Sequence, residues 1–112
     1  MLQRTGIAAF CLAAASWITA AAPSAAETWP SRPISMVVPF APGSSSDVAG
    51  RVLAAGLSEV LGQQVVVENV SGAASMTGTA RVAKAPPDGY QFVFASVDSM
   101  AIVPAMHKQP PY

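Results

Sequence analysis

Short apolar runs alternate with longer segments of helical spacing along residues 27–112. Apolar or valine-rich runs at 34–39, 64–68 and 90–95 are typical of strands that are buried in a sheet. Between the first two runs, residues 44–61 carry apolar side chains at every third or fourth position, which predicts a helix that ends at Gly62. The residues expected on its buried face are Val48, Val52, Leu53, Leu57, Val60 and Leu61.

A second helix is predicted over roughly 74–84, and it is weaker because Gly78 interrupts it. This glycine is either tolerated within the helix or lets the helix come close to a neighbouring strand or a ligand. Residues 86–89 (Pro-Pro-Asp-Gly) predict a turn before the third strand, and residues 100–106 predict a short helix. The β-α-β-α-β order predicts an α/β fold with a parallel sheet and right-handed crossovers.

The first strand leads through a loop rich in proline and glycine, Phe40–Gly43, into a serine-rich helix start. Ser44 and Asp47 have the spacing of a capping box, in which two side chains cap each other's backbone N–H groups. Such a junction directs backbone N–H groups and the positive end of the helix dipole at one point. An anion is the ligand that binds best at this point.

Three loops are expected to meet at one edge of the sheet, because ligands of parallel sheets lie outside the carboxyl ends of the strands. These loops are Phe40–Asp47, Asn69–Gly78 and Ser96–Ser99. The first two offer backbone amides and hydroxyl groups, and neutral donors of this kind suit the reversible capture of a carboxylate. The alternative is that the serines only cap helices, but two such loops favour a site.

The first 26 residues have the pattern of a cleavable export signal. Arg4 precedes an uncharged stretch at 6–22, and small residues at 24–26 allow a cut after Ala26. A membrane anchor is the alternative, although this alanine-rich run of about 17 residues is short for a span. Cys11, the only cysteine, lies in this segment, so the expected periplasmic product has no thiol chemistry. In that product acidic side chains outnumber basic ones by one, which excludes a basic nucleic-acid-binding surface.

The sequence lacks the usual enzyme motifs. Ser45 stands at the centre of a strand-to-helix turn, but Asp47 replaces the second glycine of a nucleophile elbow and the only histidine, His107, is near the C-terminus. No phosphate loop, dinucleotide fingerprint or cluster of metal-ligand spacing is present. We therefore expect a protein that is not an enzyme and that needs no cofactor or metal. A small exported hydrolase centred on Ser45 is a minor alternative.

An ordered series of segments resembles the Bug/TctC-like solute receptors, the extracytoplasmic receptors of tripartite tricarboxylate transporters. The resemblance is to their N-terminal portion and extends over nearly all of residues 27–112. The segments that carry it are Trp29–Ile34, Val37–Gly43 with Asp47, Leu57–Glu59 with Leu61–Gln63, Val65–Asn69, Gly72-Ala73, Val82–Ala85 and Pro87–Tyr90.

This resemblance implies a type II periplasmic-binding-protein fold, in which two α/β lobes close on a small organic acid. Two strand–helix loops of the first lobe would grip a ligand carboxylate through amides, hydroxyls and ordered water, with the Ser96–Ser99 loop as a third wall. Membrane subunits of the transporter are the implied protein partners. The ligand-binding residues predicted in this way are Phe40, Ser44, Ser45, Ser46, Asp47, Ser71, Gly72, Ala73, Ala74, Ser75, Ser96 and Asp98.

The chain departs from the family pattern in its loops and in its length. Family members usually have glycine at the position of Ser44 and read Gly-Ala-Gly-Gly at 72–75, so the side chains here narrow the loops. Family members are also much longer. Residues 27–112 are therefore expected to form part of the first lobe, a receptor fragment that captures a small carboxylate. The alternatives are a periplasmic sensing or interaction module and a non-functional truncated fragment.

Overall fold

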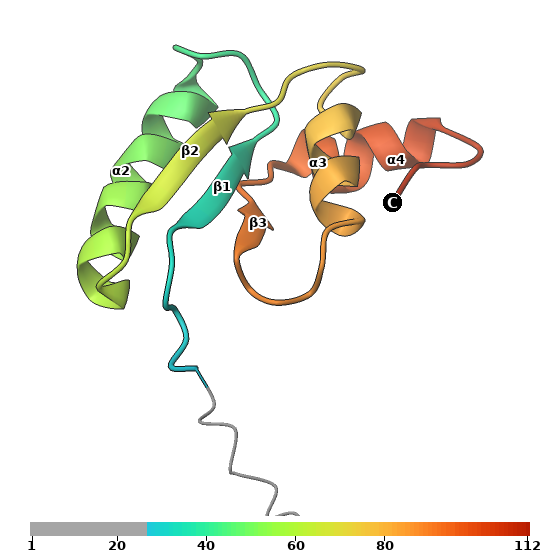
Figure 1. The fold of residues 1–112 in the computed structure, drawn as a ribbon. Helices are drawn as coiled ribbons and strands as arrows, with labels where there is room; N and C mark the ends of the chain where they lie inside the picture. The colour runs from blue at the N-terminus through green and yellow to red at the C-terminus, as the bar shows by residue number, and fades with distance from the viewer. Residues whose placement is uncertain (1–26) are drawn as a thin grey trace, which may run out of the picture.

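The computed structural model describes residues 27–112, so the predicted export signal and its cleavage after Ala26 lie outside the described residues. The predicted β-α-β-α-β order is confirmed (Figure 1). No helix of the described part is both long enough and apolar enough to cross a bilayer. The elements are β1 (Ile34–Val38), α2 (Ser45–Leu61), β2 (Val65–Asn69), α3 (Met76–Ala83), β3 (Gln91–Val93), the π-helical turn η2 (Asp98–Ile102) and α4 (Val103–Met106).

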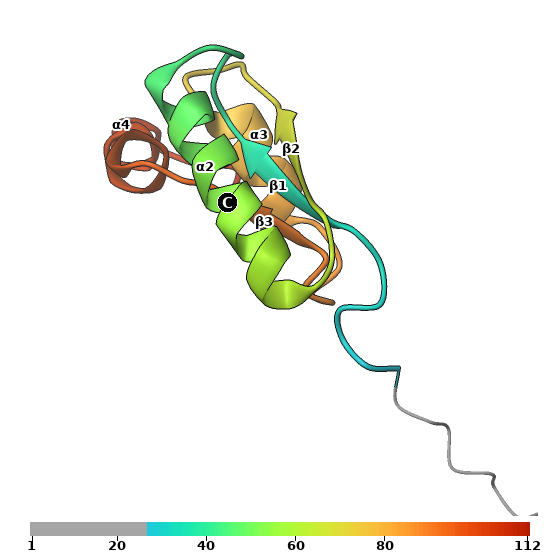
Figure 2. The same ribbon diagram turned by 90° about the vertical axis from the view of Figure 1, so that its left-hand side faces the viewer.

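The three strands form one parallel sheet in the order β2-β1-β3, as the α/β prediction requires. In the register, Ile34 of β1 faces Val65 of β2, and Met36 faces Phe92 of β3. Helix α2 covers one face of the sheet and α3 covers the other (Figures 1 and 2). The carboxyl ends of β1 and β2 therefore lie side by side, and each leads into a loop that opens a helix.

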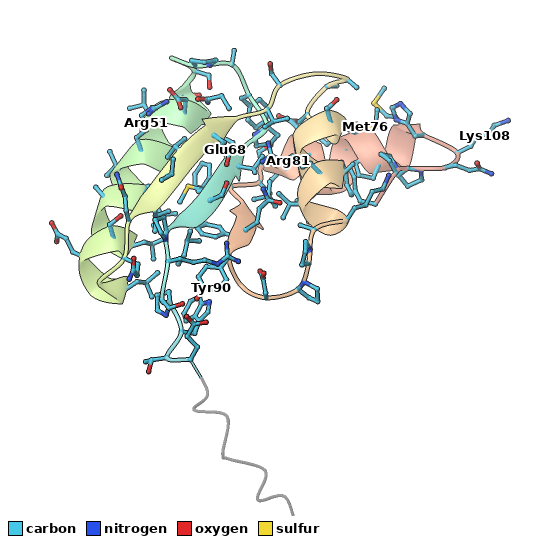
Figure 3. All side chains as sticks on the ribbon, viewed as in Figure 1. Arg51, Glu68, Met76, Arg81, Tyr90 and Lys108 are labelled. Carbon is cyan, nitrogen blue, oxygen red and sulfur yellow. The ribbon has the colours of Figure 1, made fainter. Side chains whose placement is uncertain are left out.

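The core is built around the central strand β1, whose apolar side chains are almost completely buried. On the α2 side, Ile34 and Met36 pack with Ala54 and Val65, and partly buried leucine and aromatic side chains surround this cluster. On the α3 side a polar bridge replaces part of the apolar contact. Glu68 accepts a hydrogen bond from Ser35 at 2.7 Å and forms an ion pair with Arg81 of α3 at 2.6 Å (Figure 3).

The predicted buried face of α2 is wrong for four of its six residues. Leu57 and Leu61 contact the core, but Val48, Val52, Leu53 and Val60 are exposed. The helix approaches the sheet through its small residues instead. A Cβ atom added to Gly50 would lie 3.0 Å from Cγ2 of Val38, and Ala54 is buried. Close approach through glycine and alanine turns the valine-rich side of the helix outward.

Two strands also differ from the prediction. Strand β2 was expected to be buried, but it is an edge strand in which only Val65 is buried and Val66 is 42% exposed. Within the described residues nothing pairs with its outer edge. Strand β3 comprises only Gln91–Val93 rather than 90–95. Three valines in a row predict a strand correctly, but they do not tell whether that strand is central or at an edge.

Helix α3 begins at Met76, two residues later than predicted. Of the two interpretations of Gly78, the structure supports a close approach. A Cβ atom at this position would lie 2.6 Å from the carbonyl oxygen of Val70 and 3.0 Å from Cβ of Pro39. The helix therefore lies directly against the ends of β1 and β2, and this contact places its N-terminus at the carboxyl edge of the sheet.

Candidate functional site

The first loop, between β1 and α2, is shaped by an incomplete capping box. The hydroxyl oxygen of Ser44 accepts a hydrogen bond from the N–H of Asp47 at 3.2 Å, as predicted. The return bond differs from the prediction, because the Asp47 carboxylate accepts from the N–H of Gly43 at 2.9 Å, while Ser44 N–H donates to Ala41. In the described part of the chain, the N–H groups of Ser45 and Ser46 have no intramolecular acceptor.

Asp47 is the most strongly bound carboxylate of this edge and is only 3% exposed. Besides Gly43, the Asn69 amide donates to it at 2.9 Å and Arg51 Nε at 3.1 Å. The N–H of Gly43 is the largest cause that lowers the pKa of Asp47 to about 2, followed by the side chains of Asn69 and Arg51. Both carboxylate oxygens are therefore engaged inside the protein, and their hydrogen bonds hold the first loop in place.

The second loop, between β2 and α3, has an unusual backbone. Ala73, Ala74 and Ser75 all have positive φ angles, of 47°, 52° and 76°. The N–H of Met76 donates to the carbonyl of Ala73 at 3.1 Å and closes a left-handed turn around Ala74 and Ser75. Residues with side chains rarely adopt this conformation, which costs on the order of 1 kcal/mol each and is concentrated at functional sites.

Ser75 leaves the N-terminus of α3 unsatisfied. It occupies the N-cap position, yet its side chain makes no capping hydrogen bond. Its hydroxyl is buried, and within the described residues it has no hydrogen-bond partner. Buried polar groups are nearly always paired, so an unpaired hydroxyl beside a helix N-terminus calls for an external partner. Ala73 and Ala74 stand exposed at the mouth of this loop.

In the third loop, Ser96 and Ser99 form hydrogen bonds with each other. The N–H of Ser96 donates to the Ser99 hydroxyl at 3.0 Å, and the N–H of Ser99 donates to the Ser96 hydroxyl at 3.4 Å. Ser99 is fully buried, and its carbonyl accepts a hydrogen bond from the Tyr112 hydroxyl. Asp98 is exposed at the start of η2. The hydroxyls of Ser96 and Ser99 are therefore engaged within the loop itself.

Two residues near the site were not among the predicted ones. Arg51 lies on α2 (Figure 3) and forms an ion pair with Asp47, which precedes it by one helical turn. This spacing, at which ion pairs form, is the only signal in the sequence for the contact. Asn69 ends β2 and donates to the Phe40 carbonyl at 3.2 Å as well as to Asp47. No sequence pattern links Asn69 to residues more than twenty positions earlier, so only the fold reveals this contact.

The loops carry neither lysine nor arginine at positions 39–47, 69–79 and 94–99. The guanidinium of Arg51 is already engaged by Asp47 and Asn69. His107, the one histidine, lies with Nδ1 2.8 Å from the Val103 carbonyl of its own helical turn. No group of histidine, cysteine or acidic side chains in the described residues is placed to hold a metal ion. The chemistry that the edge offers is hydrogen-bond donation from neutral groups.

Low pH is expected to lower the free energy of unfolding because it protonates Asp47. Because its folded-state pKa is about 2, below the ordinary 3.8, the stability that its charge contributes is complete above about pH 4 and is lost as the pH falls toward 2. Asp47→Asn is expected to be less stable at pH 7 and to lose less stability between pH 4 and 2. Urea unfolding of the full chain at pH 7, 4, 3 and 2 measures this. An unchanged acid slope in the variant would contradict the assignment.

Comparison with known proteins places the chain in a receptor family. The model of the tripartite tricarboxylate transporter family receptor, TctC, matches residues 49–112. The protein BugT of Bordetella pertussis is 53% identical over 76 residues, which are 68% of this chain and 23% of BugT. A UPF0065 protein of Bordetella bronchiseptica is 42% identical over 108 residues, 96% of this chain and 32% of that protein.

Solved structures agree with these matches. A periplasmic transporter has a TM-score of 0.73 and 45% identity over 75% of this chain and 28% of its own. An R. palustris protein with adipate (TM-score 0.56, 45% identity) and MatC from Rhodopseudomonas palustris with bound malate (TM-score 0.57, 38% identity) each match 58% of this chain and 22% of their own. The chain thus spans about a fifth to a third of the relatives that it matches. Since the family model covers more than half of it, the chain belongs to the TctC family of tripartite tricarboxylate transporter receptors.

Proposed function

We propose that this chain carries the carboxylate-gripping loops of an extracytoplasmic solute receptor and captures a small organic acid for a tripartite tricarboxylate transporter. One observation carries the proposal. Two loops at adjacent strand ends each open a helix, and within the described residues the N–H groups of Ser45, Ser46 and Ala73–Ser75 have no acceptor. Two helix N-termini that point unsatisfied donors at the same edge form a binding place for an anion.

The first jaw of the grip comprises the N–H groups of Ser45 and Ser46 at the start of α2. The second comprises the N–H groups of Ala73–Ser75 with the unpaired Ser75 hydroxyl. A carboxylate has two oxygens and can accept from both jaws at once. Because the donors are neutral, the ligand is held without a permanent counter-charge and can be released again.

The side chains at Ser44, Ala74 and Ser75 adapt the grip to this chain. Ser44 uses its hydroxyl oxygen to cap α2, so it stiffens the first jaw. Ala74 and Ser75 hold the second jaw in a left-handed turn, and Ser75 adds a hydroxyl that is free to donate. A rigid loop loses less conformational entropy when a ligand binds, which favours capture by few contacts.

The family relatives support a proposed ligand class, cellular location and set of partners for this chain. The R. palustris relative is described with adipate and MatC with malate, so small dicarboxylates are the first ligands to test. Two solved relatives are described as a periplasmic transporter and as the periplasmic binding protein BugD. We infer a periplasmic location for this chain, with residues 1–26 as an export signal cut after Ala26 and residues 27–112 as part of the first lobe. Transporter subunits in the membrane would be its partners.

Titration of the ¹⁵N-labelled full chain with malate or adipate tests the proposal residue by residue. We expect saturable shifts of the amide signals of residues 45–46 and 73–75, with an affinity in the millimolar range because these loops are largely open to solvent. Gly62 and Gly89 lie in turns at the other end of the strands and serve as internal references.

Adipamide, which has the length of adipate without its charges, is the matched ligand control. It is expected to cause no saturable shift, because an amide gains little from a helix dipole. The absence of saturable shifts with both acids would contradict the proposal. Equal shifts with adipamide and adipate would show that the edge does not select an anion.

A further inference from the structure

Asn69 lies at the junction between the two loops. It is the last residue of β2, and the second loop begins directly after it. Its side-chain Nδ2 group donates to the Phe40 carbonyl at 3.2 Å and to Oδ1 of Asp47 at 2.9 Å. Its Oδ1 accepts from Arg51 Nη2 at 3.2 Å. Both N–H donors and one acceptor site of the amide are therefore directed at the first loop and the start of α2.

These contacts join two segments that are far apart in the sequence. Phe40 belongs to the loop after β1, and Asp47 holds the same loop through the N–H of Gly43. On the other side, the N–H of Val70 donates to the Val38 carbonyl at 3.0 Å and continues the sheet to the start of the second loop. The side-chain amide of Asn69 thus connects the backbone of the first loop, the Asp47 carboxylate that holds this loop, and the end of β2 from which the second loop starts.

We propose that Asn69 is a positioning residue that sets the spacing between the two carboxylate-gripping loops, with the Asp47 carboxylate as its anchor. The inference rests on the proposed function. Asn69 does not itself contact the ligand in this proposal. It keeps the N–H groups of Ser45 and Ser46 at the distance from those of the second loop at which one carboxylate reaches both. Groups that support ligand-contacting residues in this way typically affect affinity by about tenfold or more when removed.

The proposal requires an amide at this position, and not merely a side chain of its size. In Asn69→Asp the new carboxylate would lie against the Asp47 carboxylate at a position where the amide now donates. Two carboxylates this close raise the pKa of one of them. As the pH falls, a shared proton therefore restores a hydrogen bond between positions 69 and 47. The charged groups that face position 69 are Asp47 and Arg51 of α2. Glu68 is directed to the other face of the sheet, where it binds Ser35 and Arg81.

Malate titration of the ¹⁵N-labelled full chain, at pH 7.0 and 5.5, compares the wild type with Asn69→Ala, Asn69→Asp and Ser58→Ala. Ser58 is the matched control, because it also joins α2 to β2, but at the opposite end. Its hydroxyl donates to the Ala54 carbonyl at 2.7 Å and accepts from the N–H of Val65 at 2.9 Å. Affinities are measured on the folded species, and urea unfolding is recorded for each variant.

We expect Asn69→Ala to bind malate roughly tenfold more weakly than the wild type at both pH values. Asn69→Asp is expected to bind more weakly still at pH 7.0 and to recover, relative to the wild type, at pH 5.5. Ser58→Ala is expected to lose stability and keep its affinity. The recovery at low pH is a signature that a merely structural role would not produce, and it decides the question even where Asn69→Ala does not fold.

Three results would overturn the proposal. Affinity of Asn69→Ala within twofold of the wild type would remove the positioning role while leaving the proposed function intact. A pH-independent loss of affinity in Asn69→Asp would show that the contact with Asp47 does not matter for binding. No binding of malate or adipate by the wild type would refute the proposed function and this inference with it.

Discussion

Met36→Ala is expected to lower the free energy of unfolding by about 2–5 kcal/mol. Met36 lies in the central strand, is 0% exposed and packs with Ile34, Ala54 and Val65. Truncation removes buried apolar atoms and leaves a cavity that neighbouring strands close only in part. A domain of this size has a modest core, so a loss of this magnitude would unfold a large share of the molecules. Urea unfolding of the full chain, followed by far-UV circular dichroism, measures it.

Val60→Ala is the control variant that tests which side of α2 faces the core. Val60 lies on the predicted buried face of α2 but is 83% exposed. Its truncation is expected to change the free energy of unfolding by no more than about 0.5 kcal/mol, since it leaves no cavity and alanine favours the helix. If Val60→Ala lowered the free energy of unfolding as much as Met36→Ala, α2 would have to present its valine-rich side to the core.

Gly78→Ala is expected to destabilise the chain by about 1–3 kcal/mol, although alanine is the better helix former. The added methyl group would stand 2.6 Å from the Val70 carbonyl oxygen and 3.1 Å from Cα of Pro39. Both are backbone atoms that cannot turn aside as a flexible side chain would, so α3 has to move away from the strand ends. For a domain of this size, each kcal/mol corresponds to about 4–8 °C in Tm.

Gly56→Ala is the matched control for this prediction. Gly56 is also a helical glycine, in α2, but a Cβ atom there would meet nothing within 4 Å. The substitution is expected to stabilise the chain by about 1 kcal/mol through helix propensity alone. Thermal unfolding of both variants gives shifts of opposite sign. A rise in Tm for Gly78→Ala would show that α3 does not need its close contact with Val70 and Pro39.

Gly78 also matters for the proposed grip. Its contact holds the first turn of α3 against the ends of β1 and β2, and the second jaw precedes that turn directly. A shift of the helix would displace the N–H groups of Ala73–Ser75 relative to the first jaw. In the proposed grip, the spacing of the two loops would therefore depend both on the hydrogen bonds of Asn69 and on the close backbone contact at Gly78.

Local patterns in the sequence determined the order of the elements and the edge where the loops meet. Runs of apolar residues predicted the three strands, helical spacing predicted α2, and Gly62 predicted its end, where it adopts φ 66° as a C-cap. Strand–helix alternation then predicted a parallel sheet with loops at its carboxyl edge. These features depend on contacts between residues close in sequence and on the handedness of crossovers, so they can be read without knowing the tertiary structure.

The side of α2 that meets the sheet was decided only by the tertiary structure. Apolar spacing favoured the valines, whereas the packed helix uses Gly50 and Ala54, because small residues let it approach Val38 closely. Periodicity counts hydrophobic side chains on a helix face and carries no information about how near the neighbouring strand lies. The edge position of β2 was missed for the same reason.

Within the candidate site, the sequence determined which loops carry the donors, and the fold decided what each side chain does. Asp47 was expected among the ligand-binding residues, but its carboxylate points inward to Gly43, Arg51 and Asn69. The unpaired hydroxyl of Ser75 and the tie made by Asn69 have no signature in the chain. Both arise from contacts between segments that only the folded sheet brings together, and for that reason no pattern of neighbouring residues could predict them.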